Sequence, residues 1–348
     1  IYLIRVQEHP QQFLYGSKPP HAMLDVLLTV VVASVVGHIL TMVFWKASCP
    51  VRDQHVFITG GSKGIGLAVA EEVLRRGARV TIAARNRDDL SKARASLAAA
   101  CPASRGKIHT VAADTTSVDQ LHAAAQSAEG ALGPVDVVIC NAGLSLPGLF
   151  SDSSLENFQR QADVNYLGTV KTIKAFLPGM LERRQGHICI ISSALAICGF
   201  AGYSSYAPTK WALRGLADCL RNELAGTGVG MSIGYPPDTQ TPGFASENEL
   251  KPKLCLAANA ALGSEVFPAE KAGRVACSIV QGIERRAYHI SSPDFGQTLL
   301  MDSMTSLSPK VLPLALSVLL APVTNIVLSL LRWRMDRAVV KARQGGAS

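Results

Sequence analysis

The segment HVFITGGSKGIG at residues 55–66 decides how this chain folds. Residues 55–59 form a short apolar, β-branched run typical of a buried strand, and an amphipathic helical pattern follows over 67–76. The glycines between them permit a tight turn and let backbone N–H groups approach a pyrophosphate at the positive end of the helix. A glycine-rich string by itself also fits a plain turn, but its position between a strand and a helix indicates a dinucleotide site. The residues expected to line this site are Gly60, Ser62, Lys63, Gly64, Ile65 and Gly66.

Short apolar runs alternate with helical patterns along the rest of the central region. This alternation predicts a doubly wound parallel sheet with helices on both faces, and the near-continuous apolar runs fit strands that are covered on both sides. We therefore expect one Rossmann-type α/β domain over residues 52–293, with about seven strands. After the strand at 55–59, the expected strands are 79–83, 107–112, 135–140, 187–192, 230–234 and 287–291.

The composition excludes several classes of protein. The 348 residues are 48% hydrophobic and 17% charged, with a formal net charge of +8, and the mean hydropathy is +0.22. The chain is too apolar for a disordered protein or for two ordinary soluble domains. Because the eight cysteines are scattered without a CxxC pair, we expect a reducing compartment, no disulfide framework and no metal site.

The excess of apolar residues lies at the two ends of the chain. Residues 26–45, VLLTVVVASVVGHILTMVFW, are long enough to span a bilayer as a helix. A secretory signal peptide is the alternative, but the run is long for one and no small-residue cleavage site follows it. We expect a polar extension at 1–22 and a transmembrane anchor at 23–46. We also hypothesise that Met23 is the biological start, which sequencing of the native N-terminus would test.

A second apolar run, VLPLALSVLLAPVTNIVLSLL, occupies residues 311–331. Two prolines and Asn325 interrupt it, so a re-entrant hairpin or two short helices fit as well as a single span. We expect an apolar membrane segment or hairpin over 294–331 and a basic tail over 332–348. The tail favours the cytosolic face of an anionic bilayer over a nucleic acid, because the chain has no separate basic domain with interleaved aromatic side chains.

The residues that end the second strand distinguish between the two nicotinamide cofactors. NAD sites carry an Asp or Glu there, which accepts a hydrogen bond from the ribose 2′-hydroxyl. This chain reads ARNR at 84–87 instead, and Arg85 together with Lys63 would pair with a 2′-phosphate. A solvated surface arginine is the alternative, but the missing acid favours NADPH. Asp114, at the end of the third strand, is expected to contact the adenine or to cap the next helix.

Tyr206 and Lys210 stand four residues apart at the start of an expected helix and so project from one face. An ammonium near a phenol favours the phenolate, which lowers the pKa of the tyrosine toward the range useful for proton transfer. Upstream, the strand at 187–191 ends in Ser192 and Ser193, whose hydroxyls could polarise a carbonyl. A YxxxK pair alone is common by chance, but its combination with a glycine loop and with NAG at 141–143 is far rarer.

In this order, TGGSKGIG, NAG, NYLG around Asn165, SS and YAPTK resemble the motifs of the short-chain dehydrogenase/reductases over residues 53–290. The resemblance implies that Tyr206 donates a proton to the substrate oxygen, while Lys210 lowers its pKa and binds the nicotinamide ribose. It also implies that Ser193, or Ser192 in its place, orients the carbonyl, and that Asn165 holds a proton-relay water. Asn141 and Gly143 would line the cofactor, Thr241 would touch its carboxamide, and the nicotinamide would supply the hydride. Since members of this family often pair through the helices around Asn165 and Tyr206, a homo-oligomer is a further expectation.

A narrower resemblance lies at residues 235–244, YPPDTQTPGF, which acidic residues and then KP at 251–252 follow. This string is similar to that of the 3-ketodihydrosphingosine reductases, endoplasmic-reticulum enzymes with a cytosolic catalytic domain and terminal membrane segments. The chain departs from the wider family twice. The usual SSxxG becomes SSALA at 192–196, and Pro208 lies inside YxxxK, a position that tolerates proline only in the first helical turn.

We expect NADPH-dependent reduction of 3-ketosphinganine to sphinganine at the endoplasmic-reticulum membrane, with the catalytic domain facing the cytosol. An anchor gives an independent reason to expect a lipid, since a long-chain ketone partitions into the bilayer and reaches a tethered enzyme laterally. The apolar stretches 144–150 and 254–267 are expected to line an acyl pocket or to pack as ordinary core. Reduction of a steroid, a retinoid or a 3-ketoacyl-CoA is the alternative. A non-enzymatic NADPH-binding membrane scaffold belongs to another class, and the complete set of site residues disfavours it.

Overall fold

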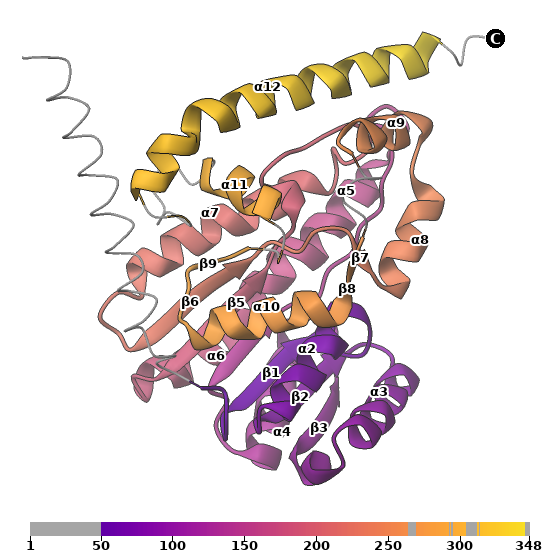
Figure 1. Cartoon of the computed structure of the whole chain (residues 1–348). Coiled ribbons are helices and arrows are strands. Elements are labelled where there is room, and N and C mark those ends of the chain that lie inside the picture. Colours follow the sequence, from indigo (N-terminus) through magenta and orange to yellow (C-terminus); the bar gives the residue numbers. More distant parts are fainter. Residues whose placement is uncertain are drawn as a thin grey trace, which may run out of the picture.

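The computed structural model describes residues 50–263, 269–291, 293, 295–303, 312 and 314–344. Within these residues, a parallel sheet of seven strands in the order β3-β2-β1-β4-β5-β6-β9 forms the centre of the molecule (Figure 1). Its strands are β1 (His55–Thr59), β2 (Arg79–Ala84), β3 (Ile108–Ala112), β4 (Val137–Cys140), β5 (Gly186–Ile191), β6 (Val229–Gly234) and β9 (His289–Ile290). The expected extension at 1–22, the proposed start at Met23 and the expected anchor at 23–46 lie outside the described residues.

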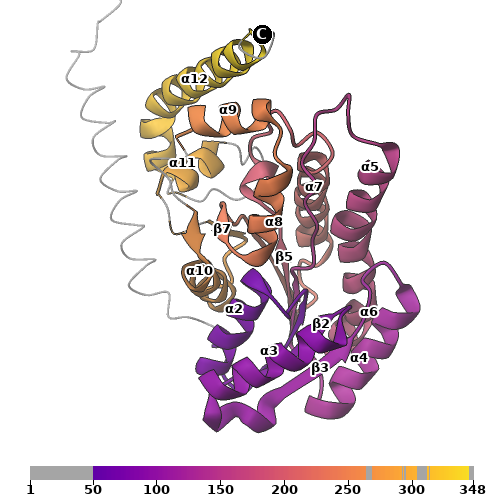
Figure 2. The ribbon, with the colours of Figure 1, turned by 90° about the vertical axis from the view of Figure 1, so that its right-hand side faces the viewer.

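Helices cover both faces of the sheet (Figure 2). One face packs against α2 (Gly64–Arg75), α3 (Arg87–Ala100) and α10 (Ala272–Glu284), and the other against α4 (Val118–Leu132), α6 (Gly168–Glu182) and α7 (Ala207–Glu223). Successive side chains of a strand point to opposite faces. Accordingly, Val56 and Ile58 of β1 enter one apolar cluster, whereas Phe57 between them enters the other.

The doubly wound parallel arrangement and all seven expected strands are confirmed in the described part of the chain. β9 is shorter than expected, with two residues instead of five, because the pairing with β6 is confined to His289 and Ile290. A separate parallel pair joins β7 (Thr239–Gln240) and β8 (Glu270–Lys271). It ties the segment after β6 to the segment before α10.

The carboxyl ends of the central strands meet at one edge of the sheet. Directly after β1, β4, β5 and β6 come the candidate segments 60–66, 141–143, 192–193 and 235–241. This is the edge at which open α/β sheets bind ligands. Around it lie α5 (Leu155–Gln161), a π-helical turn (Ala162–Leu167), α8 (Pro242–Leu250) and α9 (Lys253–Ala261), and short 3-10 turns occur at Pro102–Lys107 and Ala194–Ala196.

In the described residues after the sheet, the chain forms α11 (Phe295–Ser303) and α12 (Leu314–Gln344). α12 lies across α9 and α11 (Figures 1 and 2). It is one continuous helix that passes through Pro322 and carries both the apolar run and the basic residues of the tail. The hairpin alternative therefore does not describe residues 314–344, because packing along α9 sustains the helix despite the hydrogen bond that a proline removes. None of the helices in the described ranges combines the length and the apolar window needed to cross a membrane.

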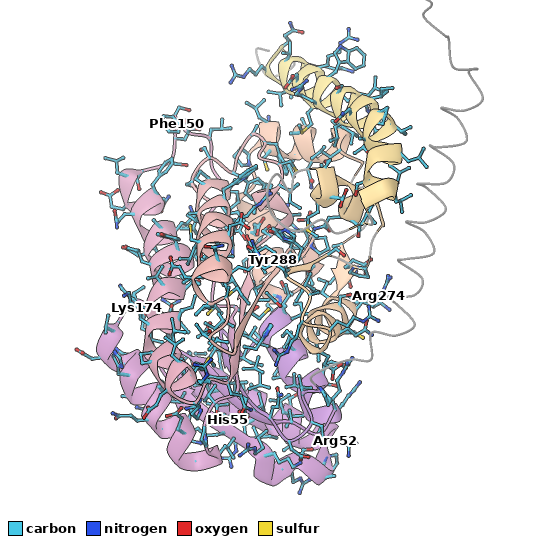
Figure 3. The ribbon with its side chains drawn as sticks, turned by 90° about the vertical axis from the view of Figure 1, so that its left-hand side faces the viewer. Arg52, His55, Phe150, Lys174, Arg274 and Tyr288 are labelled. Carbon is cyan, nitrogen blue, oxygen red and sulfur yellow. The ribbon has the colours of Figure 1, made fainter. Side chains whose placement is uncertain are left out.

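Phe57→Ala should lower the free energy of unfolding by about 3–5 kcal/mol. Phe57 is completely buried and its ring centre lies 4.5 Å from that of Phe176. The control is Phe150→Ala, since Phe150 is 75% exposed beside α5 (Figure 3) and should cost less than about 1 kcal/mol. Urea denaturation of both variants measures the difference, and equal losses would contradict the assignment of Phe57 to the core.

Candidate active site

The glycine loop between β1 and α2 has the geometry of a phosphate cradle. Gly60 has a φ of +65°, and a Cβ there would come within 3.0 Å of the Ala142 backbone. The Asn141 amide donates to the carbonyl oxygens of Thr59 (3.0 Å) and Gly60 (3.1 Å), which fixes the loop against the end of β4. Among the described residues, no side chain caps the N-terminus of α2, so its first N–H groups are available to an anion.

A cleft of about 790 Å³ opens beside this loop. Of the predicted loop residues, Gly60, Lys63, Gly64 and Ile65 line it. Gly66 instead packs behind the loop, where a Cβ would collide with the Gly60 carbonyl. Ser62 follows the positive-φ turn and is half-buried. The predicted residues Asn141, Gly143 and Thr241 line the same cleft.

Of the groups predicted to select the cofactor, Lys63 lines the cleft, whereas Arg85 and Asp114 line a separate pocket beside α5. Arg85 is exposed, and its Nη1 lies 4.0 Å from Asp114 Oδ2. Lys63 is also exposed and pairs with Asp89 at 2.7 Å. Asp114 accepts hydrogen bonds from the N–H and the hydroxyl of Thr116, both at 2.8 Å. Burial raises the pKa of Asp114, but these bonds and Arg85 outweigh it, so the pKa falls below its usual value.

Of the two roles predicted for Asp114, capping α4 belongs to another residue. Ser117 precedes that helix, and its hydroxyl accepts from Gln120 N. Asp114 shapes the turn before it, and contact with an adenine remains a prediction.

Lys210 is buried behind Tyr206. The lysine side chain is 4% exposed, its Nζ donates to the Ile191 carbonyl at 3.1 Å, and it lies 5.6 Å from the centre of the Tyr206 ring. Burial lowers the pKa of Lys210 to about 8. Burial also raises the pKa of Tyr206, the charge of Glu247 adds to this rise, and a hydrogen bond with Ser193 opposes it. The sequence predicts a lowered pKa for Tyr206, and this prediction is wrong for the structure, in which burial holds the pKa above its usual value.

The two adjacent serines have different partners. Ser192 is 4% exposed, and its hydroxyl donates to the Lys210 carbonyl at 3.0 Å. Ser193 caps the 3-10 turn after β5, accepting from Leu195 N at 3.1 Å, and its hydroxyl is hydrogen-bonded with Tyr206. The geometry thus favours Ser193 as the carbonyl-orienting residue and makes Ser192 a support for α7.

Asn165 lies in the π-helical turn and is completely buried. Its Oδ1 accepts from Leu144 N at 2.7 Å, and its Nδ2 donates to the Leu144 carbonyl (2.9 Å) and to the Thr209 hydroxyl (3.0 Å). A Cβ on Gly143 would lie 3.6 Å from Asn165 Oδ1 and 3.5 Å from Lys210 Nζ. Asn165 therefore joins the loop after β4 to the helix that carries Lys210, and its predicted role with a water remains a prediction.

The two departures from the family pattern have local explanations. Ala194–Ala196 forms a 3-10 turn whose last residue is completely buried, so a methyl group is accommodated where the family has glycine. Pro208 falls in the first turn of α7, where the missing N–H has no intrahelical partner to lose.

Residues 235–262 contribute groups to the cleft that the sequence does not single out as site residues. Asp238 and Glu247 line its wall, together with Phe244 and Leu262. Asp238 lies inside the string YPPDTQTPGF, and the acidic residues that follow this string are the signal that could have indicated Glu247. The apolar stretch 144–150 contributes Leu144 and Leu146 to the cleft, while its last residue, Phe150, is exposed.

Within the described ranges, no group of three or more His, Cys, Asp or Glu side chains could hold a metal. The seven cysteines in those ranges are free thiols.

The parallel sheet, the glycine loop at its edge and the Ser193–Tyr206–Lys210 group define a Rossmann-fold oxidoreductase. A family model described as short chain dehydrogenase matches residues 54–251. The chain belongs to this family, as the order of its motifs indicates.

Relatives with a more specific name are similar over much of the chain. A 3-ketodihydrosphingosine reductase of Dictyostelium discoideum is 32% identical over 342 residues, which cover 92% of this chain and 97% of that protein. One from Bos taurus is 39% identical over 199 residues, or 57% of this chain and 60% of that protein, so the match spans less than two thirds of the bovine relative. These relatives confirm the resemblance to the 3-ketodihydrosphingosine reductases that the string at residues 235–244 indicates.

Solved structures show the same fold. A short chain dehydrogenase/reductase from Burkholderia phymatum, crystallised in complex with NAD, superposes with a TM-score of 0.64 at 24% identity and covers 73% of this chain and 94% of its own. Levodione reductase superposes with the same TM-score at 22% identity, over 71% of this chain and 98% of its own.

Ser193→Ala should lower carbonyl reduction about 100- to 1000-fold, because it removes a hydroxyl aimed at the carbonyl and at Tyr206. Ser192→Ala should instead reduce stability by about 1 kcal/mol, with less than about a tenfold change in rate, since its hydroxyl supports the backbone of α7. Steady-state kinetics and thermal unfolding of both variants separate the two roles. A larger rate loss for Ser192→Ala would reverse the assignment.

Proposed function

We propose that this enzyme reduces 3-ketosphinganine to sphinganine with NADPH. The observation that carries the proposal is the position of the Ser193–Tyr206 pair in a cleft whose wall is largely apolar. That wall includes Leu144, Leu146, Leu195, Phe200 and Leu262. A carbonyl on a long alkyl chain fits such a lining, and the names of the relatives point to a sphingoid ketone.

The residues of the cleft account for proton transfer. Bound NADPH supplies the hydride, and the glycine loop, Asn141 and Gly143 would hold the nucleotide. Ser193 donates a hydrogen bond to the carbonyl oxygen and aligns it with the Tyr206 hydroxyl, which releases its proton to that oxygen. The phenolate left on Tyr206 is stabilised by the charge of Lys210, buried 5.6 Å from the ring centre.

Tyr206→Phe should lower kcat for 3-ketosphinganine by about 100- to 10,000-fold, since no other group replaces the proton donor. NADPH oxidation in detergent micelles measures the loss. The matched control is Tyr166→Phe, because Tyr166 packs against the apolar cluster on the face covered by α4, α6 and α7. Reduction of a steroid, a retinoid or a 3-ketoacyl-CoA, but not of this ketone, would contradict the substrate. Cofactor binding without reduction of any carbonyl would favour the scaffold.

NADPH is preferred over NADH in this proposal because of the charges beside the glycine loop. Arg85 is exposed next to Asp114, and Lys63 is an exposed cation of the loop itself. A 2′-phosphate is doubly charged and matches the planar guanidinium of Arg85. Its approach would compete with Asp114 for Arg85, at little cost because that pair is long and exposed.

Arg85→Asp should lower the ratio of kcat/KM for NADPH to that for NADH by about 10- to 100-fold, the value of one charge-assisted pair. Arg94→Asp removes an exposed charge of the adjoining α3 and should leave the ratio unchanged. Kinetics with both cofactors measure the ratio. An unchanged ratio in Arg85→Asp would remove the reason for assigning NADPH.

We further propose that the enzyme acts at the endoplasmic-reticulum membrane, with its catalytic domain in the cytosol. One face of α12 is apolar and more than half exposed at Leu319, Val323, Ile326, Leu330 and Trp333, which follow one another at helical spacing. Arg337 lies 4.7 Å from the Trp333 ring, an arrangement suited to the headgroup region. The free thiols fit a reducing compartment.

Brominated lipids in anionic vesicles should quench the fluorescence of Trp333, because this face would lie at the acyl boundary. Trp333→Phe in the full chain should therefore reduce the quenched part of the emission. Trp211→Phe, which removes the tryptophan of α7, should leave it intact. A quenched part that is the same with and without Trp333 would contradict contact between α12 and lipid.

A further inference from the structure

Two carboxylates face the substrate side of the cleft, and we name them the acidic pair. Glu247 lies on α8 and is half-buried, whereas Asp238 follows β6 and is exposed at the cleft wall. Both line the same cleft as Tyr206. The proton transfer derived above uses neither of them.

Glu247 is held in place by its neighbours. The buried Tyr203 hydroxyl donates to Glu247 Oε1. Lys251, 8% exposed, lies with its Nζ 4.7 Å from the centre of the Phe244 ring, and its charge acts on both carboxylates. Burial still raises the pKa of Glu247 above its usual value despite Tyr203 and Lys251, so these partners only partly compensate for the loss of water around the carboxylate.

The two carboxylates have no close ion-pair partner, since none of the ion pairs in the described part of the chain includes Glu247 or Asp238. The charge of Lys251 acts on both without forming such a pair. The Lys210 ammonium also lines the cleft, but its hydrogen bond goes to the Ile191 carbonyl. A half-buried carboxylate without a close ion-pair partner favours a ligand that brings a positive charge.

The acidic pair lies close to the reacting atoms. The charges of Glu247 and Asp238 both act on the Tyr206 phenol. The Tyr203 ring, whose hydroxyl bonds Glu247, has its centre 6.0 Å from that of the Tyr206 ring. A cation bound by Glu247 would therefore sit near the carbonyl that Tyr206 protonates.

We propose that Glu247, with Asp238 beside it, binds the ammonium group of an α-amino ketone and so selects this class of substrate. The proposal deepens the proposed function and rests on it, because 3-ketosphinganine carries its amine on the carbon next to the ketone. Steroids and retinoids lack the amine, and the phosphates of an acyl-CoA would be repelled. Glu247 is thus a specificity-determining residue that separates the leading substrate from its alternatives.

Binding of the amine also affects the proton donor. The negative charge of the acidic pair opposes loss of the Tyr206 proton, and an ammonium paired with Glu247 offsets that charge. A ketone without a charged amine does not offset the charge of the acidic pair, so that charge continues to oppose loss of the Tyr206 proton. The amine therefore contributes to turnover as well as to binding.

Glu247→Gln tests the proposal, because the amide keeps an oxygen to accept from Tyr203 and loses only the charge. The two substrates are 3-ketosphinganine and its N-acetyl derivative, which has the same chain and ketone but no charge. The intact enzyme should prefer the amine at least tenfold in kcat/KM. Glu247→Gln should lose about 10- to 100-fold with the amine, the value of one hydrogen bond between charged groups, and lose nothing with the N-acetyl ketone.

Two further variants complete the kinetic experiment. Asp238→Asn should shift the preference in the same direction by a smaller factor. Glu249→Gln, an exposed carboxylate on the same helix, should behave as the unaltered enzyme. Equal loss by Glu247→Gln on both substrates would show a structural role and overturn the proposal.

A binding measurement separates this proposal from the proposed function. Sphinganine and N-acetylsphinganine are compared as stabilisers of the full chain in micelles, by thermal unfolding without turnover. If the protein binds sphinganine more tightly than N-acetylsphinganine, and this preference disappears in Glu247→Gln, the ammonium site is supported. This conclusion holds even if the enzyme reduces neither ketone, because failure of reduction refutes only the proposed reaction. Equal binding of the two lipids, or a preference that survives in Glu247→Gln, overturns the ammonium site.

Discussion

The burial of the Lys210 ammonium is the constraint on which the catalytic end of this structure depends. A buried cation requires hydrogen-bond acceptors that cannot move, and Lys210 finds one in the carbonyl of Ile191, the last residue of β5. Ser192, next in the chain, returns a hydrogen bond to the carbonyl of Lys210 itself. The end of the central sheet and the start of α7 therefore hold each other, and Tyr206 is positioned as a result.

The buried Lys210 ammonium also restricts which residues can lie on the cofactor side of the cleft. Gly143 passes close to the lysine, where a larger residue would crowd both Nζ and Asn165. Asn165 uses its whole side chain to join the loop after β4 to Thr209, one residue before Lys210. Asn141 continues the connection to the glycine loop. Four segments that are far apart in the sequence thus form one polar network around a single charge, and such networks are rigid when all their members are satisfied.

The sequence predicts the sheet and the catalytic group because both depend on local patterns. β-branched runs between helical segments locate all seven strands of the described sheet, and the spacing of Tyr206 and Lys210 locates the start of α7. The preference for Ser193 over Ser192 comes from the family resemblance and not from a local pattern, since the two neighbours differ only in which way their hydroxyls point in the folded chain. The hydrogen-bond partners of Asn165 could not be predicted, because they lie 21 and 44 residues away from it in the sequence. The acidic pair is visible in the sequence as composition alone, and only packing shows that it faces Tyr206. The single helix α12 likewise depends on the surface of α9, which a hydropathy pattern does not contain.

The packing of α12 on α9 has a consequence for the order in which the protein is completed during synthesis. α9 ends just before Leu262, which lines the cleft, and α12 covers α9 from the side away from the sheet. The glycine loop and the strands β1 to β5 leave the ribosome long before α12 does, and chains fold from the N-terminal side as they emerge. The half of the cleft beside the glycine loop can therefore form while the chain is still growing, whereas the half formed by residues 235–262 gains the support of α12 only after that helix is released.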